Sequence, residues 1–78
     1  MNIEDLKVIM SGSFEREVLN FLLEKVSEGR EYFSPREVGE KIGKLPQNVK
    51  RVFSKLEDIK IMERTTIPGV YNFKGGVK

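Results

Sequence analysis

Apolar residues recur every three or four positions along three stretches of the chain, as on the buried face of an amphipathic helix. This spacing predicts helices over residues 14–28, 35–42 and 46–58. The positions expected to point into a core are Phe14, Val18, Phe21, Leu22, Val26, Val38, Ile42, Leu45, Val49, Val52, Phe53 and Leu56.

The ends of the first two helices carry capping residues. Ser13 is expected to be the N-cap of the first helix, and Gly29 is expected to end it. Ser34 is expected to cap the second helix, with Pro35 in its first turn and Glu37 completing a capping box. Both helices are therefore delimited by local sequence signals.

The second and third helices are joined by a very short connection. Gly43 ends the second helix, and only Lys44 and Leu45 precede Pro46, the first residue of the third. Two short helices joined in this way form a helix-turn-helix unit. Gly39 inside the second helix costs up to about 1 kcal/mol relative to alanine. A close helix crossing at that position, where a side chain would not fit, would offset this cost.

The spacing of the apolar residues changes after the third predicted helix. Residues 61–67 and 70–74 are rich in β-branched and aromatic side chains, and Pro68-Gly69 between them is typical of a type II turn. These runs predict a hairpin, and residues 32–33 predict an isolated strand bridge. Tyr71 is expected to close the hairpin onto the core, with stacking on a base or partner as the alternative.

The N-terminal segment, residues 1–12, is compatible with a strand or with a short helix capped by Asn2, and we favour the helix. The helix predicted over 14–28 has an apolar arc of roughly half its circumference, wider than the ~100° of an ordinary surface helix. Either the N-terminal segment or a second subunit must cover the extra width. We therefore divide the chain into this segment, a domain over 13–74 and a flexible tail over 75–78.

Composition excludes several kinds of function. The 78 residues include neither cysteine nor histidine, so thiol nucleophiles, imidazole bases and the commonest transition-metal ligands are absent. We expect no enzyme activity, no cofactor and no metal. No apolar run is long enough for a membrane span, and the N-terminus lacks the basic region of a signal peptide, so a cytoplasmic location is expected.

The net charge of +2 hides an asymmetry along the chain. Residues 1–33 carry 4 basic and 7 acidic side chains, whereas residues 34–78 carry 10 basic and 5 acidic ones. A cationic half can attract a polyanion such as a nucleic acid.

The stretch from Ser34 to Glu57 resembles the winged helix-turn-helix family of prokaryotic regulators. The shared features are a capped helix with a small residue in its middle, a glycine at the turn, and a valine-centred helix ending in leucine and glutamate. The run Ile61-Met62-Glu63-Arg64 falls where that family begins its wing. In size, charge density and lack of cysteine, the chain also resembles small DNA-binding proteins of archaea and their viruses.

The resemblance covers about residues 14–74 and implies a mainly α fold with a small β-hairpin, an α+β winged helix-turn-helix. The implied order is helix, short strand, helix, helix, strand, strand. Two features depart from the family: Leu45 stands where it often has a serine or threonine cap, and no lysine or arginine lies between Thr65 and Phe73. The second departure weakens the case for deep contact of the wing with the minor groove.

The polar side of the third helix carries the candidate chemistry. Glutamine and asparagine can bond to the adenine edge, arginine can bond to guanine in two places, and lysines can hold phosphates. The candidates for base contacts are Gln47, Asn48 and Arg51. The candidates for backbone contacts are Arg36, Lys44, Lys50, Ser54 and Lys55. The candidates for wing contacts are Arg64, Thr66 and Lys74.

The sequence thus predicts a double-stranded DNA-binding protein, a transcriptional regulator with its third helix in the major groove. A homodimer through the first helix and the N-terminal segment is expected, and no membrane partner. The alternative is a winged helix used for protein–protein contact within a larger assembly. Double-helical RNA is disfavoured, because its deep, narrow major groove does not admit a helix.

Overall fold

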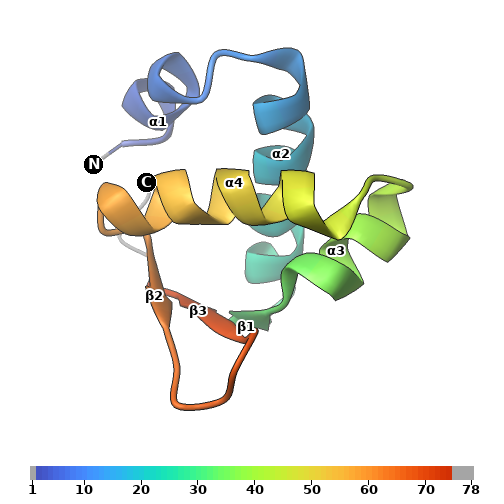
Figure 1. Ribbon diagram of the computed structural model, residues 1–78. Helices are drawn as coiled ribbons and strands as arrows, with labels where there is room; N and C mark the ends of the chain where they lie inside the picture. Colours follow the sequence, from blue (N-terminus) through green and yellow to red (C-terminus); the bar gives the residue numbers. More distant parts are fainter. Residues whose placement is uncertain (1, 75–78) are drawn as a thin grey trace.

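The computed structural model describes residues 2–74, so the tail predicted over 75–78 lies outside the described residues. The described chain forms four helices and three strands (Figure 1). They are α1 (Ile3–Ile9), α2 (Ser13–Ser27), β1 (Tyr32–Phe33), α3 (Pro35–Ile42), α4 (Pro46–Asp58), β2 (Met62–Arg64) and β3 (Tyr71–Phe73). The fold is mainly helical with a small antiparallel sheet, which confirms the predicted α+β class.

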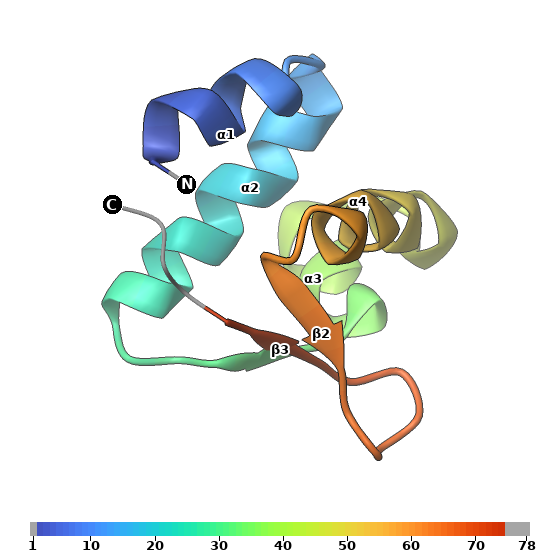
Figure 2. The ribbon, with the colours of Figure 1, turned by 90° about the vertical axis from the view of Figure 1, so that its left-hand side faces the viewer.

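The three strands form one antiparallel sheet in the order β1-β3-β2. Asn72 at the centre of β3 lies opposite Tyr32 on one side and Glu63 on the other. Figure 2 shows the sheet beside the helices, with the hairpin loop projecting away from them. The short strand expected at 32–33 is therefore integrated into the sheet as an edge.

The hairpin loop, residues 65–70, is longer than predicted because β2 ends at Arg64 and β3 begins at Tyr71. The Val70 N–H donates to the Ile67 carbonyl at 3.1 Å, and Gly69 has a φ of 79°. Both are features of a type II turn. The Thr65 hydroxyl also lies 2.9 Å from the Val70 carbonyl, to which it donates. These bonds give the loop a defined shape.

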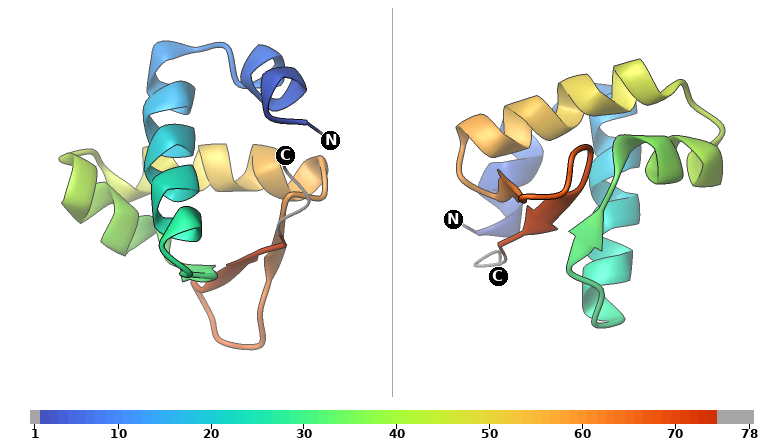
Figure 3. Two further views of the ribbon diagram at one scale, coloured as in Figure 1. Left: turned by 180° about the vertical axis from the view of Figure 1, so that it is seen from behind. Right: turned by 60° about the horizontal axis from the view of Figure 1, so that its bottom comes forward.

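The N-terminal segment covers α2, as one of the two sequence interpretations required. It forms the favoured helix, and the Asn2 side chain caps it by accepting from the Asp5 N–H at 2.8 Å. Leu6 and Met10 are completely buried in the same core as the apolar face of α2. Arg16 donates to the carbonyl oxygens of Lys7 and Met10, which joins the start of α2 to the end of α1. Figure 3 shows α1 against the upper half of α2.

The core is a single cluster shared by the helices and the sheet. Of the predicted core positions, Phe14, Phe21, Val26 and Ile42 are half-buried and Leu45 is exposed, and the rest are buried. Leu45 was placed wrongly because a helical wheel does not extend past the first residue of a helix. It is the N-cap of α4 and has extended backbone angles, so its side chain turns outward.

Two of the predicted caps differ in detail. Ser13 is the first helical residue of α2, and the N-cap is Gly12, whose N–H donates to the Glu15 carboxylate. In α3, the Ser34 hydroxyl accepts from the Glu37 N–H at 3.1 Å, as expected. The Glu37 carboxylate instead forms an ion pair with Arg30, so only half of the predicted capping box is present.

Gly39, inside α3, lies at a close approach as expected, but to the backbone of the following turn rather than at a helix crossing. A Cβ atom at this position would lie 2.6 Å from the Lys44 carbonyl oxygen, in the turn that follows. Gly43 supplies the left-handed residue of that turn, with a φ of 70°. The two glycines allow α3 and the start of α4 to pack tightly.

Candidate nucleic-acid interface

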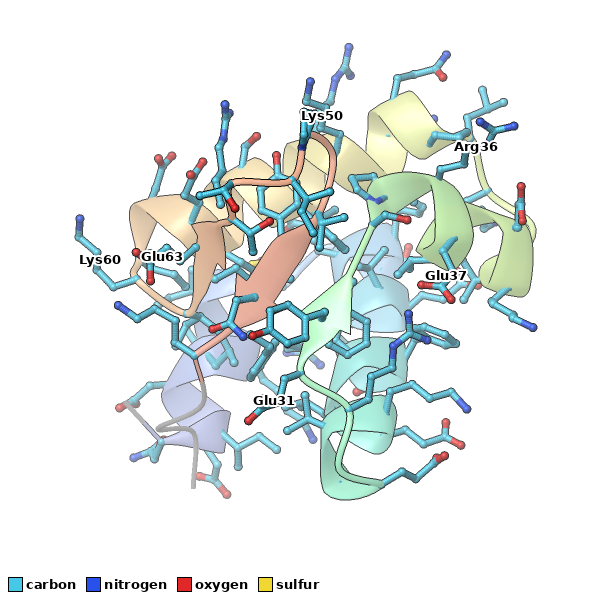
Figure 4. The ribbon with its side chains drawn as sticks, turned by 90° about the horizontal axis from the view of Figure 1, so that it is seen from below. Glu31, Arg36, Glu37, Lys50, Lys60 and Glu63 are labelled. Atoms are coloured by element: carbon cyan, nitrogen blue, oxygen red, sulfur yellow. The ribbon has the colours of Figure 1, made fainter. Side chains whose placement is uncertain are left out.

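Packing determines which side of α4 faces solvent. Val49, Val52, Phe53 and Leu56 are buried against the rest of the core. The opposite side of the helix is exposed, and we call its residues Gln47, Lys50 and Arg51 the exposed face of α4. Pro46 and Asp58 are also exposed, at the two ends of the helix. Figure 4 shows the Lys50 side chain extending away from the protein at this side of the molecule.

The two cations of the exposed face have no acidic partner within the described residues. None of the ion pairs formed by residues 2–74 includes Lys50 or Arg51. Both charges are therefore available to an external anion, without an internal carboxylate to displace.

The flank of α4 nearest α2 differs from the exposed face. Lys44, before the helix, lies 4.0 Å from Glu17, and Lys55 lies 2.8 Å from Glu15. Asn48 is half-buried and sits seven residues before Lys55, hence on the same flank. Two predicted phosphate contacts are thus engaged with carboxylates of α2, and one predicted base contact is turned toward that side.

The Lys55–Glu15 contact perturbs the carboxylate. The hydrogen bond from the Lys55 ammonium is the main cause of a pKa for Glu15 below its ordinary value, and the Gly12 N–H adds to the effect. Partial burial acts in the opposite direction and raises the pKa. Glu15 remains ionised at neutral pH and holds Lys55 electrostatically.

A groove separates the exposed face of α4 from the hairpin loop. It holds about 400 Å³ and is lined by Lys50, Thr66 and the N-terminal end of α3. An adjoining, more apolar hollow of about 360 Å³ brings Arg36 and Gln47 to the same region. The structure thus collects, around one concave surface, predicted contacts from α3, α4 and the hairpin loop.

Arg36 lines the second hollow, whereas Ser54 lines neither of the two. Arg36 is highly exposed and lies 3.7 Å from Glu40, one turn along the same helix. Such an exposed pair contributes little to stability and is easily exchanged for another anion. Ser54 is half-buried one turn beyond Arg51 on α4.

Of the remaining predicted wing contacts, Arg64 lines the groove with Lys50 and Thr66, whereas Lys74 does not. The Arg64 Nε lies 3.2 Å from a carboxylate oxygen of Glu57, so this cation is partly neutralised. The structure does not bring Lys74 to the hairpin loop. Its N–H donates to the Ile61 carbonyl and its ammonium pairs with Glu63, at the opposite end of the hairpin.

Sequence reasoning missed two exposed apolar side chains near this surface. Leu45 is 57% exposed before α4, and Ile67 is 61% exposed in the hairpin loop. Ile67 was expected in a strand, and only the break at Pro68 signalled a loop. Tyr71, by contrast, is 3% exposed and packs edge-on against Phe53, which leaves no face free for stacking on a base.

Other kinds of site are not found in the described part of the chain. Residues 2–74 contain no group of three or more acidic side chains arranged to hold a metal ion. None of the helices described above is long and apolar enough to cross a membrane.

Comparison with protein-family models, with curated proteins and with solved structures finds no match for this chain. The functional interpretation therefore depends on the geometry and charge of the surface around α4.

Proposed function

We propose that the protein is a winged-helix protein that binds double-stranded DNA with α4 in the major groove. The observation that carries this proposal is the exposed face of α4, where a glutamine lies beside two cations that form no ion pair within residues 2–74. A major groove about 12 Å wide admits an α-helix. In this arrangement Arg51 bonds to a guanine edge, Gln47 to an adenine edge, and Lys50 to a phosphate.

The arrangement of the other elements supports a winged helix. A helix-turn-helix, α3 and α4, is followed directly by the β2–β3 hairpin, and β1 pairs with β3 to complete the sheet. The groove between α4 and the hairpin loop has Lys50 on one wall and Thr66 on the other. We propose that one DNA strand passes along this groove, with Arg36 at its edge.

We further propose that this binding regulates transcription, by occlusion or recruitment at a promoter. A two-fold dimer would then require two half-sites about one helical turn apart, or a multiple of it. Because α1 already covers α2, the dimer is not needed to bury the apolar arc of that helix. The dimer is a separate proposal, which ultracentrifugation at micromolar concentration tests: a monomer alone would contradict it.

Direct binding to nucleic acids tests the main proposal. Wild-type protein is titrated into labelled random-sequence DNA duplex and, separately, RNA duplex at low salt. We expect DNA binding in the micromolar range and clearly weaker RNA binding, because a helix cannot enter the A-form major groove. Folded protein that binds no DNA at low salt would overturn the proposal and favour the alternative, a winged helix used for protein–protein contact.

A further inference from the structure

Leu45 occupies the N-cap of α4, and its side chain makes no capping hydrogen bond. The two polar N-caps, Asn2 and Ser34, do make one. Asn2 accepts from the Asp5 N–H, and Ser34 accepts from the Glu37 N–H. A serine, threonine, asparagine or aspartate is strongly preferred at this position, because its oxygen satisfies an otherwise free amide of the first turn. Leucine at this N-cap therefore weakens the helix start.

Burial of the Leu45 side chain does not compensate for the missing capping hydrogen bond. Its side chain is 57% exposed, whereas the apolar residues that follow it on the inner side of α4 are almost completely buried. An exposed leucine gains little from the hydrophobic effect on folding. Leu45 therefore stabilises neither the helix start nor the core. A contact with a binding partner would explain a leucine at this position.

Leu45 stands at the end of α4 that carries the exposed face. Pro46 separates it from Gln47, and the hollow beside Pro46 and Gln47 is lined mainly by apolar atoms. If α4 lies in a major groove, its N-terminal end meets the base edges. The one apolar group that the bases present there is the C5-methyl group of thymine.

We propose that Leu45 contacts a thymine C5-methyl group beside the base contacted by Gln47, and so makes the interface selective for thymine. This inference rests on the proposed DNA-binding function and adds a residue that determines specificity. Gln47 and Leu45 together favour A·T pairs under the first turn of α4.

Replacement of thymine by deoxyuridine tests the contact, because it removes only the methyl group. A preferred duplex is first selected from a random pool with wild-type protein, and its thymines are then replaced one at a time. We expect the wild type to lose about three- to tenfold in affinity at one position. Leu45→Ala and Leu45→Ser should bind the thymine and uracil duplexes equally.

A matched control and a stability measurement separate recognition from folding. Val8→Ser removes another exposed apolar side chain, 72% exposed on α1, and should keep the wild-type discrimination. Leu45→Ser should also raise Tm by about 4–8 °C by restoring a cap, whereas Leu45→Ala should not. Discrimination lost while stability increases cannot come from damage to the fold.

The possible failures are distinguishable. Wild-type protein that binds no duplex overturns the proposed function itself. Wild-type protein that selects a site without thymine, or that binds the uracil duplexes as tightly as the thymine duplex, overturns the role of Leu45 alone. Leu45 variants that keep the wild-type discrimination do the same.

Discussion

The ammonium of Lys55 lies 2.8 Å from a carboxylate oxygen of Glu15, forty residues earlier in the chain. This pair joins the flank of α4 to the start of α2, and Lys44 approaches Glu17 on the same side. The acids of α2 thus neutralise one flank of α4. Among residues 2–74, Lys50 and Arg51 on the exposed face are the cations of this helix that form no ion pair.

Glu15→Gln should strengthen DNA binding, because it frees Lys55 for a phosphate. The amide oxygen of glutamine can still accept from the Gly12 N–H, so the start of α2 is preserved. We expect the slope of log K against log salt to steepen by about 0.9, as for one added phosphate contact. Glu24→Gln changes the net charge equally on an exposed part of α2 outside any of the ion pairs described. The same gain in both variants would contradict a specific release of Lys55.

The pKa of Glu15 makes the stability of the domain depend on pH. Because the Lys55 hydrogen bond lowers this pKa below its ordinary value of 4.5, the pair stabilises the fold fully above that pH. The contribution is lost as the pH falls from about 4.5 through the lower pKa of the folded state. Urea unfolding from pH 7 to 3 should show a smaller acid loss in Glu15→Gln than in the wild type. Parallel pH profiles would contradict the assignment.

Gly39→Ala should destabilise the domain, although the same change in an ordinary helix stabilises it. The added Cβ would meet the Lys44 carbonyl oxygen at 2.6 Å, and this atom belongs to the backbone of the turn. We expect a loss of about 1–3 kcal/mol in the free energy of unfolding. Lys41→Ala on the exposed side of the same helix should change it by less than about 0.5 kcal/mol. A gain in stability for Gly39→Ala would show that α3 and the turn are packed more loosely than described.

Leu6→Ala tests whether α1 belongs to the core. Leu6 is completely buried, so its truncation should cost about 2–5 kcal/mol in chemical denaturation. Val8→Ala, on the exposed side of the same helix, should be nearly neutral. Equal effects of the two changes would mean that α1 does not cover α2 in solution.

The helix-turn-helix was predictable from sequence because the residues that begin and end its helices are local signals. Ser34 and Pro35 begin α3, and Gly43 and Pro46 separate it from α4, so both helices have the predicted bounds. The end of α4 at Asp58 was also predicted, although no glycine follows it. Lys60 takes the left-handed conformation there, with a φ of 68°, at a position where glycine is the usual signal.

The electrostatics of the candidate interface were less predictable than its backbone. The polar side of α4 follows from the spacing of its buried valines, so Gln47 and Arg51 could be assigned from sequence. The partner of Lys55 could not, because Glu15 becomes its neighbour only through the crossing of α2 and α4. Leu45 was misplaced for a related reason: the N-cap does not continue the helical wheel.

The central claim, DNA binding by the exposed face of α4, is tested most directly by a salt series with Lys50→Ala. Binding to random-sequence duplex is measured for the wild type, Lys50→Ala and Lys7→Ala, which removes an exposed cation from α1 instead. We predict that Lys50→Ala weakens binding and reduces the salt slope by about 0.9, while Lys7→Ala changes neither. Equal effects of the two variants, or an unchanged slope in Lys50→Ala, would contradict the account.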